Sequence, residues 1–175
     1  MTEAQPRLVL IGPPGSGKTT VGTILARRLS TGFRDTDADV EEQAGKSVAD
    51  IFVEDGEPHF RALEREAVTT ALAMHPGVLA LGGGAVMDSH TQSALAGYAA
   101  GGGVVVFLDV SLAQAAPRVG FNQARPLLVG NPRARWAELM EARRPTYERL
   151  ATLRVHSDGR SAHEMAETIH QEVQA

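Results

Sequence analysis

Residues 12–19, GPPGSGKT, constrain this chain more than any other stretch, because they match G-x-x-x-x-G-K-[ST] at every fixed position. An apolar run at 7–11 precedes the motif, and residues 18–29 follow it with apolar side chains at helical spacing. The motif is therefore expected between a buried strand and a helix. In that context its glycines let backbone N–H groups and the helix N-terminus surround phosphate oxygens. The sequence predicts a nucleoside triphosphate site.

The residues of this phosphate loop have separate expected roles. The Lys18 ammonium is expected to reach the β- and γ-phosphates and to act in catalysis, because charge develops there during phosphoryl transfer. The Thr19 hydroxyl is expected to ligate Mg²⁺. The nucleotide-binding residues predicted from the loop are Gly12, Gly15, Ser16, Gly17, Lys18, Thr19 and Thr20.

Composition narrows the class of protein. Hydrophobic residues make up 43% of the 175 positions and charged residues 22%, which is typical of one globular domain, here residues 1–175. With no cysteine and six scattered histidines, neither a disulfide nor a zinc site is expected. A net charge of −4 gives no reason to expect a nucleic-acid partner.

Membrane and secretion signals are also not recognisable. The longest uncharged apolar stretch, 98–108, is too short to span a bilayer, and the opening residues, MTEAQPR, lack the pattern of a signal peptide. A cytoplasmic protein without a membrane partner is therefore predicted. A monomer is expected, because no long apolar stripe remains once the core residues are assigned.

Short apolar runs alternate with segments of helical periodicity along the chain. Strands are predicted at 7–11, 33–35, 78–81, 104–108 and 153–155, and helices at 18–29, 40–44, 47–53, 57–74, 89–99, 111–118, 133–150 and 161–173. Residues 119–132 are expected to form a loop, and the glycines at 101–103 a turn, since they precede a strand and not a helix. This alternation predicts an α/β fold of three layers, with a central parallel five-stranded sheet flanked by helices.

Among proteins with a phosphate loop, the sequence favours a small-molecule kinase. A GTPase switch needs an Asn-Lys-x-Asp motif, but Lys18 and Lys46 are the only lysines and each follows a glycine. A motor or transport ATPase would need a longer chain with partner-binding segments. About 175 residues are enough for a core, a lid and an acceptor pocket.

The segment 35–37, DTD, comes directly after the second predicted strand, at the end where open α/β sheets bind ligands. On an extended segment, Asp35 and Asp37 would point the same way, towards the phosphates. One could hold the metal's water shell while the other meets an acceptor hydroxyl. The alternative is a solvated turn in which Asp37 or Asp39 caps a helix.

The chain resembles the shikimate kinase family over essentially its whole length. The resemblance rests on the order and spacing of short strings: the phosphate loop, 35–37 (DTD), 49–52 (ADIF), 55–57 (DGE), 60–61 (FR) with Glu64, 82–86 (GGGAV), 125–128 (RPLL), and Arg143 with Pro145 and Tyr147. It implies a P-loop kinase fold and ATP-dependent phosphorylation of the shikimate 3-hydroxyl. The products would be ADP and shikimate 3-phosphate, in the route to chorismate and the aromatic amino acids.

On the acceptor side, the resemblance implies that Asp37 binds the shikimate hydroxyls and accepts the 3-hydroxyl proton. Arg61 and Arg143 would clamp the shikimate carboxylate, and Glu64 would orient Arg61. Planar guanidinium forks suit a carboxylate in a dry pocket. Gly83 and Gly84 would let the backbone approach the ring. The acceptor-binding region would span about 37–66.

On the nucleotide side, the resemblance implies a lid at about 119–132, whose Arg125 folds over the phosphates and acts in catalysis. Arg118 would lie against adenine, and residues 159–162 would supply the other wall of that pocket. Asp35 would lie near Mg²⁺ together with Thr19, and ATP and shikimate would be the partners.

Several alternatives remain open from the sequence. A gluconate kinase would share the phosphate loop, and a catalytically silent nucleotide-binding regulator would turn over no acceptor. Arg61 could be a surface partner of Glu57 or Glu64, and one residue of the Arg143-Arg144 pair could lie on a solvated helix face. Asp109 is expected to cap the helix that follows its strand.

Overall fold

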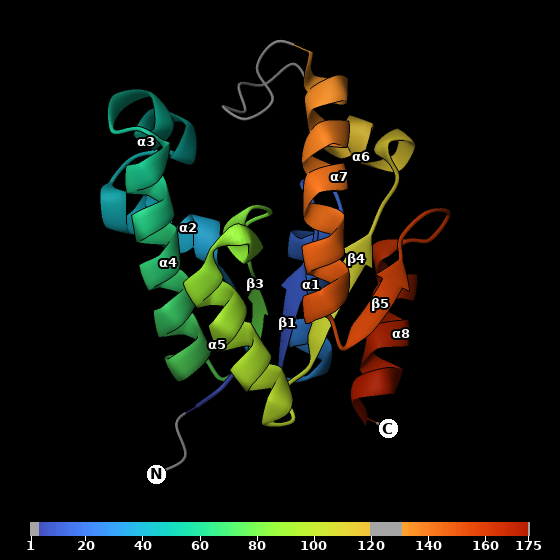
Figure 1. The fold of residues 1–175 in the computed structure, drawn as a ribbon. Helices are drawn as coiled ribbons and strands as arrows, with labels where there is room; N and C mark the ends of the chain where they lie inside the picture. The colour runs from blue at the N-terminus through green and yellow to red at the C-terminus, as the bar shows by residue number, and fades with distance from the viewer. Residues whose placement is uncertain (1–3, 120–130, 175) are drawn as a thin grey trace.

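Five parallel strands form one sheet at the centre of the molecule (Figure 1). The computed structural model describes residues 4–119 and 131–174. The strands are β1 (Leu8–Ile11), β2 (Phe33–Asp35), β3 (Val78–Ala80), β4 (Val105–Asp109) and β5 (Leu153–His156), in the order β2-β3-β1-β4-β5. Val9 pairs with Leu79 of β3 and Val105 of β4, so β1 is the central strand. All four residues of β1 are buried, so both of its faces are covered. The predicted α/β fold of three layers is confirmed.

Helices cover both faces of the sheet because successive strand residues point to opposite sides. Leu8 and Leu10 pack against α1 (Lys18–Arg28) and α8 (Ala162–Gln174). Val9 and Ile11 pack on the other face, which α4 (Glu57–Met74), α5 (Ser89–Ala100) and α7 (Pro132–Leu150) cover (Figure 1). Among the described helices, none is long and apolar enough to cross a lipid bilayer.

A small separate core lies beyond the carboxyl edge of the sheet. It joins α2 (Thr36–Ala44), α3 (Val48–Glu54) and the first turns of α4, and its buried residues are Val40, Ile51, Phe60 and Ala67. The Ser47 hydroxyl caps α3 by accepting a hydrogen bond from the Asp50 N–H. These helices make up most of the predicted acceptor-binding region, 37–66. They lie beside β3, on the side of the sheet away from β5 (Figure 1).

One helix begins earlier than its sequence suggests. The helix expected at 40–44 starts at Thr36, because the Asp35 carboxylate accepts a hydrogen bond from the Asp37 N–H and caps it. The expectation that Asp35 and Asp37 share an extended segment is therefore wrong, since Asp37 lies in the first turn of α2. The alternative in which Asp37 or Asp39 is the cap is also wrong.

Two short helices complete the described fold: η1 (Ala85–Met87), which follows the glycine triplet 82–84, and α6 (Leu112–Val119). Most of the predicted lid at 119–132, including Arg125, lies outside the described residues. At its two ends, α6 finishes at Val119 and α7 begins at Pro132, where the Asn131 side chain accepts a hydrogen bond from the Ala134 N–H.

Candidate active site

The phosphate loop connects β1 to α1, as the motif predicts. Gly17 is the N-cap residue of α1 with φ 96°, and because glycine has no side chain, no side-chain cap occupies the helix N-terminus. Gly15 has φ 82°, and a Cβ atom there would lie 2.8 Å from Val119 and 2.9 Å from the Ala115 carbonyl. The loop therefore needs glycine at both positions, and the first N–H groups of α1 face its hollow.

Lys18 reaches back across the loop from the first turn of α1. Its ammonium donates hydrogen bonds to the carbonyls of Gly12 (2.7 Å) and Pro13 (3.0 Å), and lies 3.5 Å from the hydroxyl of the buried Ser16. A positive charge is thus held over the hollow where N–H groups already favour an anion.

Thr19 and Asp35 place two oxygen ligands side by side. The Thr19 hydroxyl lies 3.4 Å from Asp35 Oδ2, although the two residues belong to different elements. Hydroxyl and carboxylate oxygens suit Mg²⁺, which binds through few protein ligands and keeps several waters. Within 4–119 and 131–174, no group of three or more His, Cys, Asp or Glu side chains could hold a metal ion, so this pair fits a metal shared with phosphates better than an all-protein site.

The pKa of the Asp37 carboxyl group is strongly raised. Burial raises the pKa of Asp37 to about 7, and the negative charges of Asp35 and Glu64 act in the same direction. Lys18 opposes them by favouring the charged carboxylate. A carboxyl group that titrates near neutral pH, in a cleft beside a phosphate loop, is suited to accept a proton from a substrate hydroxyl.

Arg61 and Arg143 converge on the glycine triplet from α4 and α7. A Cβ atom on Gly84 would lie 2.7 Å from both terminal nitrogens of Arg61 and 2.9 Å from Nη2 of Arg143. A Cβ atom on Gly83 would lie 3.3 Å from Nη1 of Arg143. The two guanidinium groups therefore occupy the space that a side chain in the triplet would fill, so their partnership depends on glycine at these positions.

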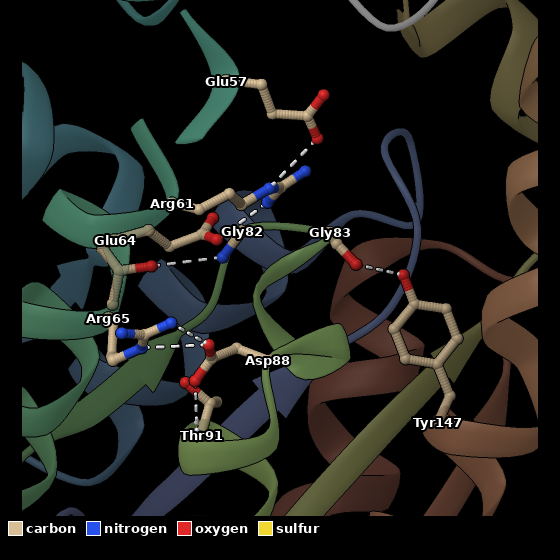
Figure 2. Close-up of polar contacts among 10 residues, drawn as sticks. Glu57, Arg61, Glu64, Arg65, Gly82, Gly83, Asp88, Thr91 and Tyr147 are labelled. Atoms are coloured by element: carbon tan, nitrogen blue, oxygen red, sulfur yellow. Dashed lines mark hydrogen bonds and ion pairs between the residues drawn. The ribbon is translucent and has the colours of Figure 1, made fainter. Parts of the chain in front are cut away.

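Carboxylates on α4 hold the Arg61 side chain in place (Figure 2). Arg61 donates a hydrogen bond to Glu64 at 2.8 Å, and its Nε lies 3.4 Å from Glu57. Glu64 is buried, and burial raises its pKa although the neighbouring Arg61 and Arg143 act in the opposite direction. Both surface partnerships considered for Arg61 are present, and the same side chain still faces Arg143.

Arg143 and Arg144 point to different parts of the molecule. Arg143 is buried beside the glycine triplet, whereas Arg144 is partly exposed and pairs with Asp109 at 2.8 Å. Arg154 also pairs with Asp109, so this carboxylate does not cap the next helix as expected. The cap of that turn is Ser111, whose hydroxyl accepts a hydrogen bond from the Gln114 N–H.

A cavity of about 300 Å³ joins the loop to the acceptor side. Its lining brings together residues that are far apart in the chain: Pro14, Gly15, Gly17, Lys18, Thr19, Thr20, Asp35, Asp37, Leu81, Gly82, Gly83 and Arg118. Arg118 reaches it from α6 and donates a hydrogen bond to the Gly15 carbonyl at 3.2 Å. Residues 159–162, expected to wall an adenine pocket, lie between β5 and the first residue of α8 and do not line this cavity.

Gly82 is a site residue that the sequence reasoning did not single out, although it belongs to the quoted glycine triplet. Its N–H donates a hydrogen bond to the Thr36 hydroxyl at 3.1 Å. A Cβ atom on Gly82 would lie 2.5 Å from Asp37 Oδ1 and 3.0 Å from Glu64. The run of three glycines was the signal in the sequence that could have identified Gly82. A Cβ atom at each of the three positions would meet a different set of side chains.

A parallel sheet with a phosphate loop at its carboxyl edge, facing a partly buried carboxylate across one cavity, defines a P-loop kinase. The shikimate kinase family model matches residues 14–174. Shikimate kinases from Thermobifida fusca and Streptomyces coelicolor are 55% and 54% identical, over 98% and 93% of this chain and 97% and 92% of theirs. This chain belongs to the shikimate kinase family, whose members are phosphotransferases.

Solved structures agree with this assignment. A shikimate kinase from Acinetobacter baumannii, in complex with shikimate, has a TM-score of 0.90 and 31% identity, covering 99% of this chain and 94% of its own. A gluconokinase from Sinorhizobium meliloti has a TM-score of 0.59 and 19% identity, covering 98% of this chain and 93% of its own, which shows a shared fold only. The gluconate kinase alternative is therefore less well supported.

Proposed function

We propose that this enzyme transfers the γ-phosphoryl group of ATP to the 3-hydroxyl of shikimate, giving shikimate 3-phosphate and ADP for chorismate and aromatic amino acid biosynthesis. The observation that carries the proposal is the convergence of Arg61 and Arg143 at Gly84, next to the cavity shared by Asp37 and Lys18. The complex of the Acinetobacter baumannii relative with shikimate supports the choice of acceptor.

On the acceptor side, Arg61 and Arg143 bind the shikimate carboxylate. Two guanidinium forks in a partly buried pocket can offer several charge-assisted hydrogen bonds to one carboxylate. Gly83 and Gly84 leave room for the ring. Asp37 binds the reacting hydroxyl and takes its proton as the oxygen attacks phosphorus, a role that fits a pKa of about 7.

On the donor side, Lys18 and the N–H groups of the loop bind the phosphates. Lys18 stabilises the negative charge that grows on the γ-phosphoryl oxygens in the transition state. Arg118 lies against adenine. Arg125, which falls outside the described residues, enters the site on a lid formed by residues 119–132 and adds a second positive charge.

Thr19 and Asp35 would hold Mg²⁺, directly or through its waters. The oxygen donors and their 3.4 Å separation fit a hard divalent cation. When bound, the ion supplies positive charge to the phosphate oxygens. We further propose that the enzyme is a cytoplasmic monomer, which size-exclusion chromatography with light scattering and cell fractionation would test.

A phosphoryl acceptor screen tests the proposal directly. The purified chain is incubated with ATP and Mg²⁺ and with shikimate or gluconate, and ADP release and the phosphorylated product are measured. Shikimate 3-phosphate is the expected product, and Lys18→Ala is expected to abolish its formation while the fold is retained. Failure of the wild-type enzyme to phosphorylate shikimate would overturn the proposal, and ATP binding without any turnover would favour a nucleotide-binding regulator.

A further inference from the structure

Helix α7 contacts the backbone of two loops, the phosphate loop at 12–19 and the glycine triplet at 82–84. The Trp136 indole N–H donates a hydrogen bond to the Pro14 carbonyl in the phosphate loop, at 2.9 Å. The Tyr147 hydroxyl donates one to the Gly83 carbonyl in the glycine triplet, at 2.5 Å (Figure 2). These bonds join residues 122 and 64 positions apart, so neither is a local feature of the chain.

The two loops also touch each other at the same place. A Cβ atom on Gly83 would lie 3.0 Å from Pro14 Cδ, so the carbonyl groups that α7 holds belong to directly adjacent residues. Pro14 and Gly83 also line the cavity that Lys18 and Asp37 share. A shift of either loop would therefore change the distance between the nucleotide and acceptor sides.

Both donors are firmly held. Trp136 and Tyr147 are buried, and the Tyr147 ring stacks on Phe107 of β4 with centroids 5.0 Å apart. They lie about three helical turns apart on α7, which places them on the same face. Arg143 lies on that face too, one turn before Tyr147, so the hydroxyl sets the glycine triplet against this guanidinium.

The phenol remains a donor over the working pH range. Burial raises the pKa of Tyr147 to about 12, although the adjacent Arg143 guanidinium acts in the opposite direction. The indole N–H of Trp136 does not titrate, and it can only donate. Neither contact depends on solution pH near neutrality.

We propose that Trp136 and Tyr147 are positioning residues, through which α7 holds each loop in its own place: Trp136 holds the phosphate loop and Tyr147 holds the glycine triplet. Neither acts through contact with substrate: Trp136 acts through the Pro14 carbonyl, and Tyr147 acts through the Gly83 carbonyl and through its side-chain hydrogen bond with Arg143. The identity of the acceptor rests on the function proposed above, whereas the action of Trp136 on the phosphate loop does not.

Removing each donor separately tests the proposal. Tyr147→Phe keeps the ring and its stacking and removes only the hydroxyl; we expect KM for shikimate to rise about tenfold, with KM for ATP changed less than about twofold. Trp136→Phe removes the indole N–H; we expect the reverse, with KM for ATP raised and KM for shikimate nearly unchanged. ADP affinity by titration calorimetry should fall for Trp136→Phe alone.

Tyr98, the other tyrosine of the chain, provides a matched control. Tyr98 is also buried, and its hydroxyl also donates to a backbone carbonyl, that of Pro6, at 2.8 Å. Pro6 precedes β1, at the opposite edge of the sheet from the site. Tyr98→Phe should lower the melting temperature about as much as Tyr147→Phe and leave both KM values unchanged.

The outcomes separate this proposal from the function proposed above. If the wild-type enzyme phosphorylates shikimate but Tyr147→Phe behaves kinetically like Tyr98→Phe, the positioning role is wrong and the function stands. Equal effects of both substitutions on both KM values would also overturn it. If the wild-type enzyme does not use shikimate, or if Tyr147→Phe does not fold, the ADP affinity of Trp136→Phe is compared with that of the wild-type enzyme. Equal affinities then overturn the proposal.

Discussion

Asp37 shows how burial tunes a single carboxyl group. If Asp37 in its charged form accepts the substrate proton, kcat/KM for shikimate should rise with pH and level off above a midpoint near 7, the value to which burial raises its pKa. Asp37→Asn should lower kcat by about 100-fold or more. A pH-rate series on both proteins checks this, and an unchanged kcat would mean that the carboxylate does not take the proton.

The same raised pKa has an opposite consequence for stability. A carboxyl group whose pKa is higher in the folded than in the unfolded chain stabilises the fold while it is protonated, and this contribution is lost as pH rises through about 7. Asp37→Asn should therefore melt several degrees above wild type at about pH 8, with the difference shrinking towards about pH 4. Melting curves across this range would contradict the assignment if the difference stayed constant.

Arg61 tests whether a planar fork is required. Arg61→Lys retains the charge but loses parallel hydrogen bonds, and we expect kcat/KM for shikimate to fall about 10- to 100-fold with KM for ATP nearly unchanged. Arg65→Lys is the matched control. Arg65 lies one turn further along α4, its side chain is half exposed, and it pairs with Asp88. Equal kinetics of the two variants would remove Arg61 from the acceptor clamp.

At the scale of elements, the connection from β3 to η1 depends on glycine, because guanidinium groups occupy the space that a side chain at Gly84 would need. Gly84 has φ −95°, which alanine adopts without strain, so Gly84→Ala acts only through the two guanidinium groups that its methyl would displace. Because these are ends of flexible side chains, we expect a folded protein whose KM for shikimate rises at least about tenfold. Gly97→Ala in α5, where a Cβ meets nothing within 4 Å, should leave kinetics unchanged. Kinetic assays and melting curves of both variants separate the two effects.

At the scale of the whole molecule, Asp109 connects three elements, because this residue of β4 forms ion pairs with Arg154 of β5 and Arg144 of α7. Burial alone would raise its pKa, but Arg144 and Arg154 outweigh this and lower the pKa. Asp109→Ala should cost about 1–3 kcal/mol, lowering the melting temperature by about 5 °C at neutral pH. The difference in melting temperature between the two proteins should shrink as acid protonates Asp109 in the wild type. A carboxylate whose pKa is lowered by folding stabilises the fold only at pH values where it is charged. Glu148→Ala, which removes a more exposed partner of both arginines, should cost about 0.5 kcal/mol or less.

The order of strands and helices was predictable because its signals are local. Alternating apolar runs predict buried strands, and the motif at 12–19 encodes its own loop through neighbouring residues. The start of α2 was missed because residues 36–39, three of which are polar, carry no helical periodicity. The capping role of Asp35 is visible only in the folded chain. The strands before and after were placed within one or two residues.

The candidate site was predictable as a list of residues but not as an arrangement. Lys18, Asp37, Arg61 and Arg143 came from the motif and from the family resemblance, and the structure brings them around the loop, the cavity and the glycine triplet. Which of two adjacent arginines faces inward could not be read from the sequence, since the answer depends on what α7 meets. The sequence likewise assigned no partner to Trp136 or Tyr147.

The sequence by itself determined the fold class, the phosphate loop and the residue types available for phosphoryl transfer, because these depend on local periodicity and on contiguous residues. Only the tertiary structure decided the pKa of Asp37, the partners of Asp109 and the contacts of α7 with both loops. Each of these depends on charge, burial or hydrogen bonds between segments that are far apart in the chain and adjacent only once the sheet has formed.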